Sequence, residues 1–132
     1  MSRRKHVSMM TAKEIAYVRK LVNEKRTMVA LGEHMKERTE TRGLTAHDIR
    51  GALFYGAIIE VNIKNDFPRA LMRGRGANKQ GEVTCLVLDL RTGVIITSYK
   101  NKMDDTHETL DASIYTPDMD VIKEVDKILS HT

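Results

Sequence analysis

Three residues whose side chains could hold and break a phosphodiester stand four positions apart: His34, Arg38 and Arg42. Because a four-residue step overshoots one helical turn by about 40°, all three would share one face of an α-helix. An imidazole titrates near neutral pH, whereas guanidiniums keep a fixed charge and present forked donors to phosphate oxygens. The spacing suggests a phosphate site, although arginines so spaced more often form a solvated helix face.

A second candidate pair comes from the apolar segment Val94 to Tyr99. If this segment is a strand, its two-residue period places Thr97 and Tyr99 on one face with Ile95, and Ile96 on the other. Tyr99 could stack on a base or donate a proton, and Thr97 could hydrogen-bond a phosphate oxygen. The alternative is that both residues only build the sheet, which β-propensity alone favours.

A third group is basic: Arg69, Arg73 and Arg75. These side chains suit contacts to a phosphate backbone, which give affinity without sequence choice. A sheet edge protected by charge would explain them nearly as well.

The charge of the chain is divided unevenly. Residues 1–75 hold 16 Lys and Arg against 8 Asp and Glu, whereas residues 76–132 hold 6 against 10, giving +8 and −4 within a net charge of +4. A basic first half that contains the His/Arg row favours an anionic partner. Nucleic acid is the commonest partner of this kind for a small cytoplasmic domain, although charge alone is weak evidence.

Other classes of site find little support. The single cysteine, Cys85, lies in an apolar run and is expected to be buried, and neither a secretory signal nor a membrane span is visible, so we expect a cytoplasmic protein without membrane contact. The acidic stretch from Asp104 to Glu108 could attract a metal ion, but adjacent carboxylates in a polar loop are usually only solvated. We expect no metal and no cofactor.

Helical periodicity appears in four segments. A capping box of Thr11 and Glu14 predicts a helix up to about Glu24, and a second helix would follow from Thr27 to Arg42, ending at Gly43. A third helix is predicted from Thr45 to Gly56. The last helix would have Thr116 as its cap and Pro117 at its first position.

Between the third and last helices the period changes to that of strands. We expect four strands, joined by short turns and by a flexible loop over residues 74–81: Ala57–Lys64, Arg69–Arg73, Glu82–Leu90 and Val94–Tyr99. Short connections allow only antiparallel pairing. The predicted architecture is α+β, with N-terminal helices packed on a four-stranded antiparallel sheet and a C-terminal helix.

We expect one domain over residues 1–132. Residues 1–26 would form a basic segment and a helix, residues 27–100 a core, and residues 101–132 a polar arm and the last helix.

The order of motifs in the core resembles the domain-of-unknown-function 4258 family. The resemblance covers about residues 30–100 and rests on His34-x-x-x-Arg38-x-x-x-Arg42-Gly43-Leu44-Thr45, Asp48-Ile49, Ala52-Leu53, Gly56, Ile58-Ile59-Glu60 and the strand Val94 to Tyr99. The chain departs from the family at Ser98, where an apolar residue is usual, and in its basic loop around Gly74.

The resemblance implies a fold similar to the RelE and BrnT toxins, within the barnase, EndoU, colicin and RelE group of metal-independent ribonucleases. His34 and Arg38 would then match polar helix positions of that group, and Thr97 and Tyr99 would match its last strand. Arg42 would belong to the helix end and to phosphate positioning.

Two functions remain open at this point. The first is a small RNA-binding protein that acts as a metal-independent endoribonuclease of the toxin type, with an antitoxin as a possible partner. The second is a non-catalytic accessory protein of a phage or mobile element, which uses the same fold to bind a host protein or nucleic acid. In the second case the first helix and the residues after Asn101 could build a partner surface or a homodimer.

Overall fold

The fold is that of a computed structural model, which describes residues 2–25, 46–77, 81–102 and 114–131. The described residues form five strands, one 3₁₀ turn and three α-helices. In chain order these are β1 (Ser2–His6), η1 (Val7–Met9), α1 (Ala12–Lys25), α3 (Ala46–Tyr55), β2 (Ala57–Lys64), β3 (Phe67–Ala77), β4 (Glu82–Asp89), β5 (Ile95–Lys102) and α4 (Val121–Leu129). The predicted second helix lies outside the described residues. None of the described helices is long and apolar enough to cross a membrane.

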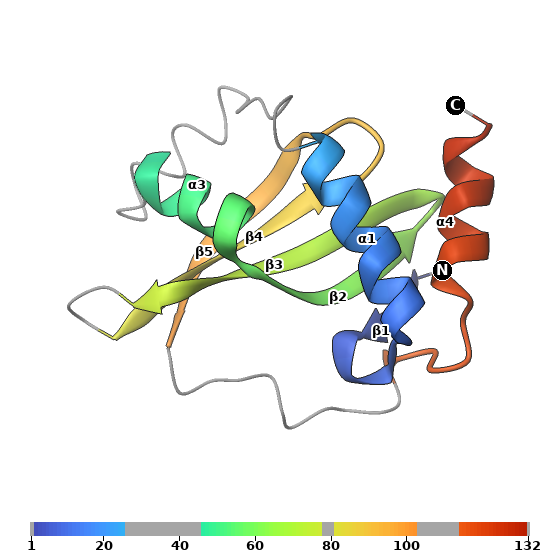
Figure 1. The fold of residues 1–132 in the computed structure, drawn as a ribbon, viewed down its shortest axis with the longest axis horizontal. Coiled ribbons are helices and arrows are strands. Elements are labelled where there is room, and N and C mark those ends of the chain that lie inside the picture. Colours follow the sequence, from blue (N-terminus) through green and yellow to red (C-terminus); the bar gives the residue numbers. More distant parts are fainter. Residues whose placement is uncertain (1, 26–45, 78–80, 103–113, 132) are drawn as a thin grey trace.

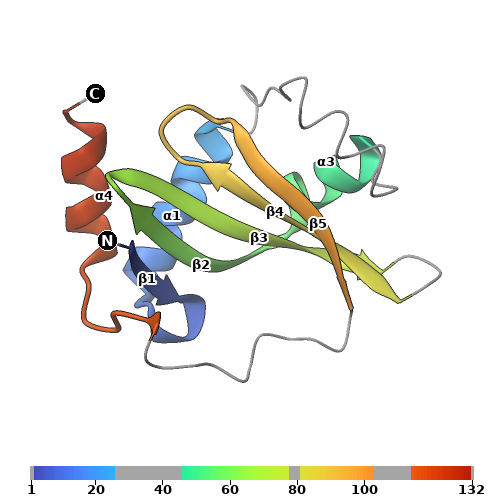
Figure 2. The ribbon, with the colours of Figure 1, turned by 180° about the vertical axis from the view of Figure 1, so that it is seen from behind.

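The strands form one antiparallel sheet in the order β1-β2-β3-β4-β5. Helices α1 and α3 lie against one face of this sheet, and α4 packs beside α1 at its end (Figure 1). Seen from behind, the other face carries none of the described helices (Figure 2). The α+β architecture and the antiparallel pairing are therefore as predicted.

Helix α1 begins with the capping box that its sequence predicts. The backbone N–H of Thr11 donates to Oε1 of Glu14 at 2.9 Å, and the backbone N–H of Glu14 donates to Oγ1 of Thr11 at 3.1 Å. Val18 and Val22 of the same helix are fully buried against the sheet. Local signals in the sequence thus correctly set both the start and the buried face of α1.

Gly56 ends α3, as predicted, and its environment shows why only glycine fits there. A Cβ atom at this position would lie 2.1 Å from the carbonyl oxygen of Ala52 and 2.7 Å from that of Arg73. The chain must pass this close to β3 as it leaves α3 and enters β2, so a side chain is excluded.

Tight turns connect β2 with β3 and β4 with β5, which confirms the predicted meander. Asn65 and Asp66 both have positive φ, 50° and 63°, as the primed two-residue hairpin turns require. In the second turn Gly93 has a φ of 79°, and a side-chain oxygen of Asp89 accepts the backbone N–H of Arg91 at 2.8 Å.

The sheet has five strands, not the predicted four, because the basic N-terminal segment is itself a strand. Ser2–His6 pairs antiparallel with β2, with Arg4 opposite Asn62 and Lys5 opposite Val61. The sequence of β1 does not show the alternation of polar and apolar residues that marks a strand, because a lysine and not an apolar residue occupies a position that faces the core. Lys5 is only 5% exposed.

A buried polar network makes this lysine tolerable. Nζ of Lys5 donates to both carboxylate oxygens of Glu14, at 2.9 and 3.0 Å, and to the carbonyl oxygen of Met119 at 2.8 Å, while the backbone N–H of Val121 also donates to Glu14. Burial raises the pKa of Glu14, but the hydrogen bonds from Lys5, Thr11 and Val121 outweigh it and hold the pKa below its ordinary value. One ion pair thereby joins β1 to the starts of α1 and α4.

Several predicted boundaries were wrong. Strand β3 begins at Phe67 and not at Arg69, and β5 continues to Lys102 and not only to Tyr99. Strand β3 continues to Ala77, so residues 74–77, expected as loop, are extended, and a register shift between Arg73 and Ala77 accommodates the glycines there. Helix α4 begins at Val121 with Asp120 as its cap, whose side chain accepts the backbone N–H of Lys123 at 3.1 Å. Thr116, the expected cap, lies in the segment before α4, where its backbone N–H donates to the carbonyl oxygen of Arg4 in β1 at 2.7 Å and its own carbonyl oxygen accepts the N–H of Met119 at 3.1 Å.

Both helices outside the family-like core supply core side chains. Val18 and Val22 from α1 and Val121 and Val125 from α4 are fully buried in the same apolar cluster as the sheet. The apolar stripes of these helices are thus covered within the chain itself.

Candidate functional site

The face of the sheet opposite α1 and α3, here called the open face, gathers polar side chains from all five strands. Residues paired directly across antiparallel strands point to the same side. The register therefore aligns three rows on this face, which are Arg4–Asn62–Arg69, Glu60–Leu71–Val87–Thr97 and Arg73–Cys85–Tyr99.

A cavity of about 230 Å³ is hollowed into the open face. Its lining comes from every strand and consists of Arg4, Glu60, Asn62, Arg69, Leu71, Val87, Ile96, Thr97 and Tyr99. Three residues proposed from the sequence, Arg69, Thr97 and Tyr99, thus meet around one cavity.

Thr97 and Tyr99 share this face as expected, but their neighbours were assigned wrongly. Ile95 is fully buried in the core, whereas Ile96 lines the cavity beside Thr97. A bulge in the pairing of β4 with β5, between Val87 and Leu88, shifts the alternation by one residue. A strict period of two cannot reveal such an extra residue.

The phenol of Tyr99 is held in its protonated form. Burial raises its pKa to about 12, and the Cys85 thiol and the Glu60 carboxylate add to this effect, which Arg73 opposes. The group is therefore a hydrogen-bond donor at neutral pH. It is unsuited to act as a general base.

A charged cluster fixes one side of the cavity. The guanidinium of Arg4 donates to both carboxylate oxygens of Glu60, at 2.7 and 2.8 Å, and the hydroxyl of Tyr115 donates to the same carboxylate at 3.2 Å. The Arg4 guanidinium also lies 5.3 Å from the centre of the Tyr115 ring. The charge of Arg4 is thus offset by Glu60, and both side chains are held in place.

Arg69, another cation of the open face, makes no such ion pair among the described residues. Nε of Arg69 is buried, and within the described part of the chain it has no hydrogen-bond partner. Such an orphaned donor costs about 1 to 3 kcal/mol and calls for an explanation. Arg73 donates from its guanidinium to the carbonyl oxygen of Lys102 at 3.1 Å, which holds it beside Tyr99.

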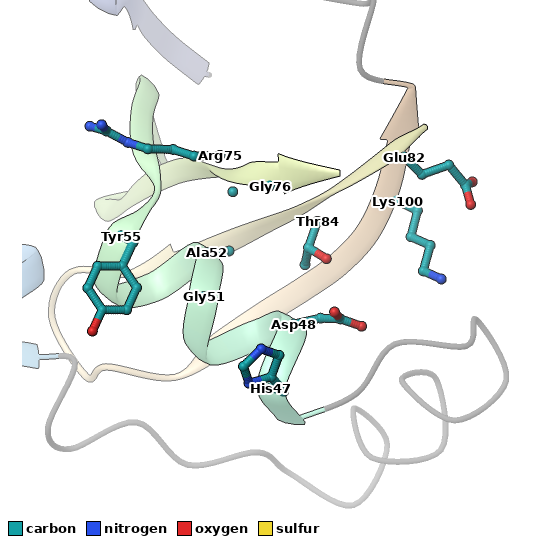
Figure 3. A pocket seen from close by; sticks show the side chains of 11 residues that line it. His47, Asp48, Gly51, Ala52, Tyr55, Arg75, Gly76, Glu82, Thr84 and Lys100 are labelled. Atoms are coloured by element: carbon teal, nitrogen blue, oxygen red, sulfur yellow. The ribbon is translucent and has the colours of Figure 1, made fainter. Parts of the chain in front are cut away.

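Among the described candidates, Arg75 does not line this cavity. Arg75 lies within the irregular part of β3, between Arg73 and Ala77, and lines a separate cavity beside α3 (Figure 3). His34, Arg38 and Arg42 fall outside the described residues, as does the acidic stretch from Asp104. Among the residues that are described, no three of His, Cys, Asp and Glu lie close enough to hold a metal ion.

Sequence reasoning missed three residues of the site: Arg4, Glu60 and Tyr115. Glu60 was visible as one of the alternating polar positions of its strand, but nothing marked it as buried beside a cation. Arg4 stood in a run of basic residues that looked like a tail. No local signal marks Tyr115, because its role depends on the chain after β5 returning to β1.

Comparison with known proteins adds one finding. Residues 31–100 match a family described as Domain of unknown function (DUF4258), over the part of the chain that carried the resemblance. No curated protein and no solved structure matches the chain. Since the family match covers more than half of the 132 residues, the chain belongs to the DUF4258 family.

Proposed function

We propose that this chain is a small RNA-binding protein of RelE-like fold, which docks RNA on the open face of its sheet and acts as a metal-independent endoribonuclease of the toxin type. The observation that carries the proposal is the meeting of Arg69, Thr97 and Tyr99 around one cavity. The basic first half of the chain supports an anionic substrate.

The lining suits a phosphate group of RNA. A cavity of about 230 Å³ is smaller than the roughly 300 to 1,000 Å³ typical of sites that enclose a whole small molecule. It can therefore receive one phosphate or the edge of one base from a chain that lies across the sheet. The orphaned Nε of Arg69 offers a donor to a phosphate oxygen, where a charge-assisted bond would be strong.

Each side chain has a role in the proposed cleavage. The 2′-hydroxyl of RNA attacks the adjacent phosphorus, and the bond to the 5′-oxygen breaks. Arg69 and Arg73 would stabilise the charge that develops on the phosphate, and Tyr99, which keeps its proton, would donate to a phosphate or leaving oxygen. The proton acceptor would be His34, assisted by Arg38; both residues lie outside the part of the chain that the structure describes.

Cleavage of RNA in the presence of a chelator tests the proposal. The wild-type protein should nick a mixed RNA panel, and Tyr99→Phe should slow nicking by about 100-fold or more, since removing a general acid typically costs at least that factor. His34→Ala should abolish it. Tyr17→Phe is a matched control, because Tyr17 is another partly buried tyrosine with a raised pKa, caused mainly by burial, but it belongs to α1.

The outcomes separate the roles. Nicking that Tyr99→Phe and Tyr17→Phe reduce equally would reject a special role for Tyr99, and a wild-type protein that leaves every RNA uncut would reject the enzyme.

One observation favours the second candidate, a non-catalytic accessory protein that binds nucleic acid or a host protein. On the open face His6 is only 7% exposed and its ring packs edge-on against Tyr115 at 5.9 Å, while Tyr99 holds its proton. The described part of this face therefore offers no accessible base. RNA binding by wild type, lost in Arg69→Ala but without nicking, would support this candidate.

A further inference from the structure

We propose a second ligand site, for a nucleotide unit, in the cavity between α3 and the ends of β3, β4 and β5. This cavity has a volume of about 380 Å³, which falls within the range of sites that enclose a small molecule. Its charged and aromatic lining residues are His47, Asp48, Tyr55, Arg75, Glu82 and Lys100 (Figure 3). The site lies on the helix-covered side of the sheet, so it stands whether or not the open face cleaves RNA.

Charges of both signs select the class of ligand. Arg75 and Lys100 both line the cavity and make no ion pair with another described residue, so each can contribute positive charge toward an anion. Asp48 and Glu82 line the same cavity and would repel a simple anion. Each carboxylate already has an interaction within the chain, but its two oxygens together offer about four acceptor positions, so it can also accept an N–H group of a base. A nucleotide carries both a phosphate and such N–H groups, and it therefore fits better than an anion or a cation alone.

The positions of these groups also suit a two-part ligand. Figure 3 shows Tyr55 and Arg75 at one end of the cavity and Glu82 and Lys100 at the other, with Asp48 and Thr84 between them. Tyr55 is 75% exposed, which leaves its ring free to stack on a base. The phosphate of the same nucleotide would then lie against one of the two cations of the lining, Arg75 or Lys100.

Glycines open the wall of the cavity on both sides. A Cβ atom added at Gly51 of α3 or at Gly76 of β3 would meet nothing within 4 Å, so the packing of the chain does not require glycine at either position. Glycine within a helix is unfavourable. Because neither glycine has a side chain, the cavity is wider and has more room for a planar ligand.

Titration calorimetry with the full-length protein tests the site. The four ribonucleoside monophosphates, guanosine and inorganic phosphate are the probes. At least one monophosphate should bind more tightly than guanosine or phosphate, and Arg75→Ala, Lys100→Ala and Tyr55→Ala should each weaken its binding about tenfold. Tyr55→Phe should retain it, because the stacking ring remains.

Two further variants separate this site from the open face. Gly51→Leu should abolish nucleotide binding by filling the cavity, and Gly51→Ala, a smaller change, should weaken it while the circular dichroism spectrum stays unchanged. Tyr99→Phe and Arg69→Ala should bind the nucleotide as wild type does. Loss in these two open-face variants with retention in Gly51→Leu would overturn the site, as would failure of every monophosphate to bind.

Competition identifies the source of the nucleotide. Displacement by a short RNA with a terminal phosphate, but not by the same RNA without it, would identify the end of an RNA strand as the ligand. Displacement by free monophosphates alone would identify a free nucleotide.

Discussion

Two neighbouring cations of β1, Arg4 and Lys5, point to opposite faces of the sheet and show how differently the two faces are built. On the covered face Lys5 has three hydrogen bonds within 3.0 Å, all to Glu14 and Met119, and is 5% exposed. On the open face Arg4 and Glu60 also pair, but beside them Arg69 has a buried Nε without a partner in the described residues.

The difference distinguishes a charged side chain that stabilises the fold from one that, in our proposal, binds a ligand. A buried cation whose donors are all engaged explains itself through the fold. A buried donor left over beside a cavity does not, and our proposal assigns it to a phosphate oxygen of RNA. The cavity beside that donor is also lined by a protonated tyrosine, Tyr99.

The largest expected effect is a loss of stability when the buried ion pair on the covered face is broken. Lys5→Ala should lower the free energy of unfolding by about 3 to 5 kcal/mol, because it leaves the Glu14 carboxylate buried without its cation. Urea unfolding measures this. Arg3→Ala is the control, since Arg3 pairs with Glu124 at the surface, and its loss should change stability little. Equal effects of the two variants would remove the distinction between buried and surface pairs.

Two glycines of the covered side should respond in opposite ways to alanine. Gly56→Ala should destabilise by about 1 to 3 kcal/mol or more, because its Cβ would meet two carbonyl oxygens. Gly51→Ala should stabilise by up to about 1 kcal/mol, because its Cβ meets nothing and alanine favours the helix. Thermal unfolding measures both, and destabilisation by Gly51→Ala would contradict the open space beside α3.

A pH titration sharpens the picture of the open face. The folded-state pKa of Tyr99 is raised from 10.0 to about 12, so its stabilising contribution is complete below pH 10 and is lost as the pH rises through 12. Difference absorbance of tyrosinate between wild type and Tyr99→Phe measures the pKa. Ionisation of Tyr99 near pH 10 in the folded protein would show that the ring is not desolvated.

The smallest expected effect is on the salt dependence of RNA binding. If Arg69 contacts one phosphate of single-stranded RNA, Arg69→Ala should reduce the slope of log affinity against log salt by about 0.7. Fluorescence anisotropy at several salt concentrations measures the slope. Lys13→Ala is the control, because Lys13 is an exposed residue of α1, and a slope reduced equally by both variants would speak against a docked phosphate.

Local chemistry made much of the fold predictable. The capping box of Thr11 and Glu14 and the stop at Gly56 depend on residues close in sequence, and both were correctly predicted. Strand β1 could not be found in this way, since its partner β2 lies more than fifty residues further on and Lys5 breaks its pattern.

The candidate site was predictable only in part, for the same reason. Thr97 and Tyr99 share a face because strands alternate, but the bulge that exchanges Ile95 for Ile96 is decided by pairing with β4. The orphaned Nε of Arg69 and the arrival of Tyr115 depend on the whole sheet. Long-range contacts, and not the residue types, set these features.

The most direct measurement of the central claim is a titration with single-stranded RNA, followed through the methyl resonances of the Arg75→Ala protein, in which the proposed nucleotide site is weakened. We expect shifts at Leu71, Val87 and Ile96, which line the cavity of the open face. Little change is expected at Ile15, Ile122 and Ile128, which are half-exposed on α1 and α4. Shifts at the helix residues without shifts at the cavity would contradict RNA docking on the open face.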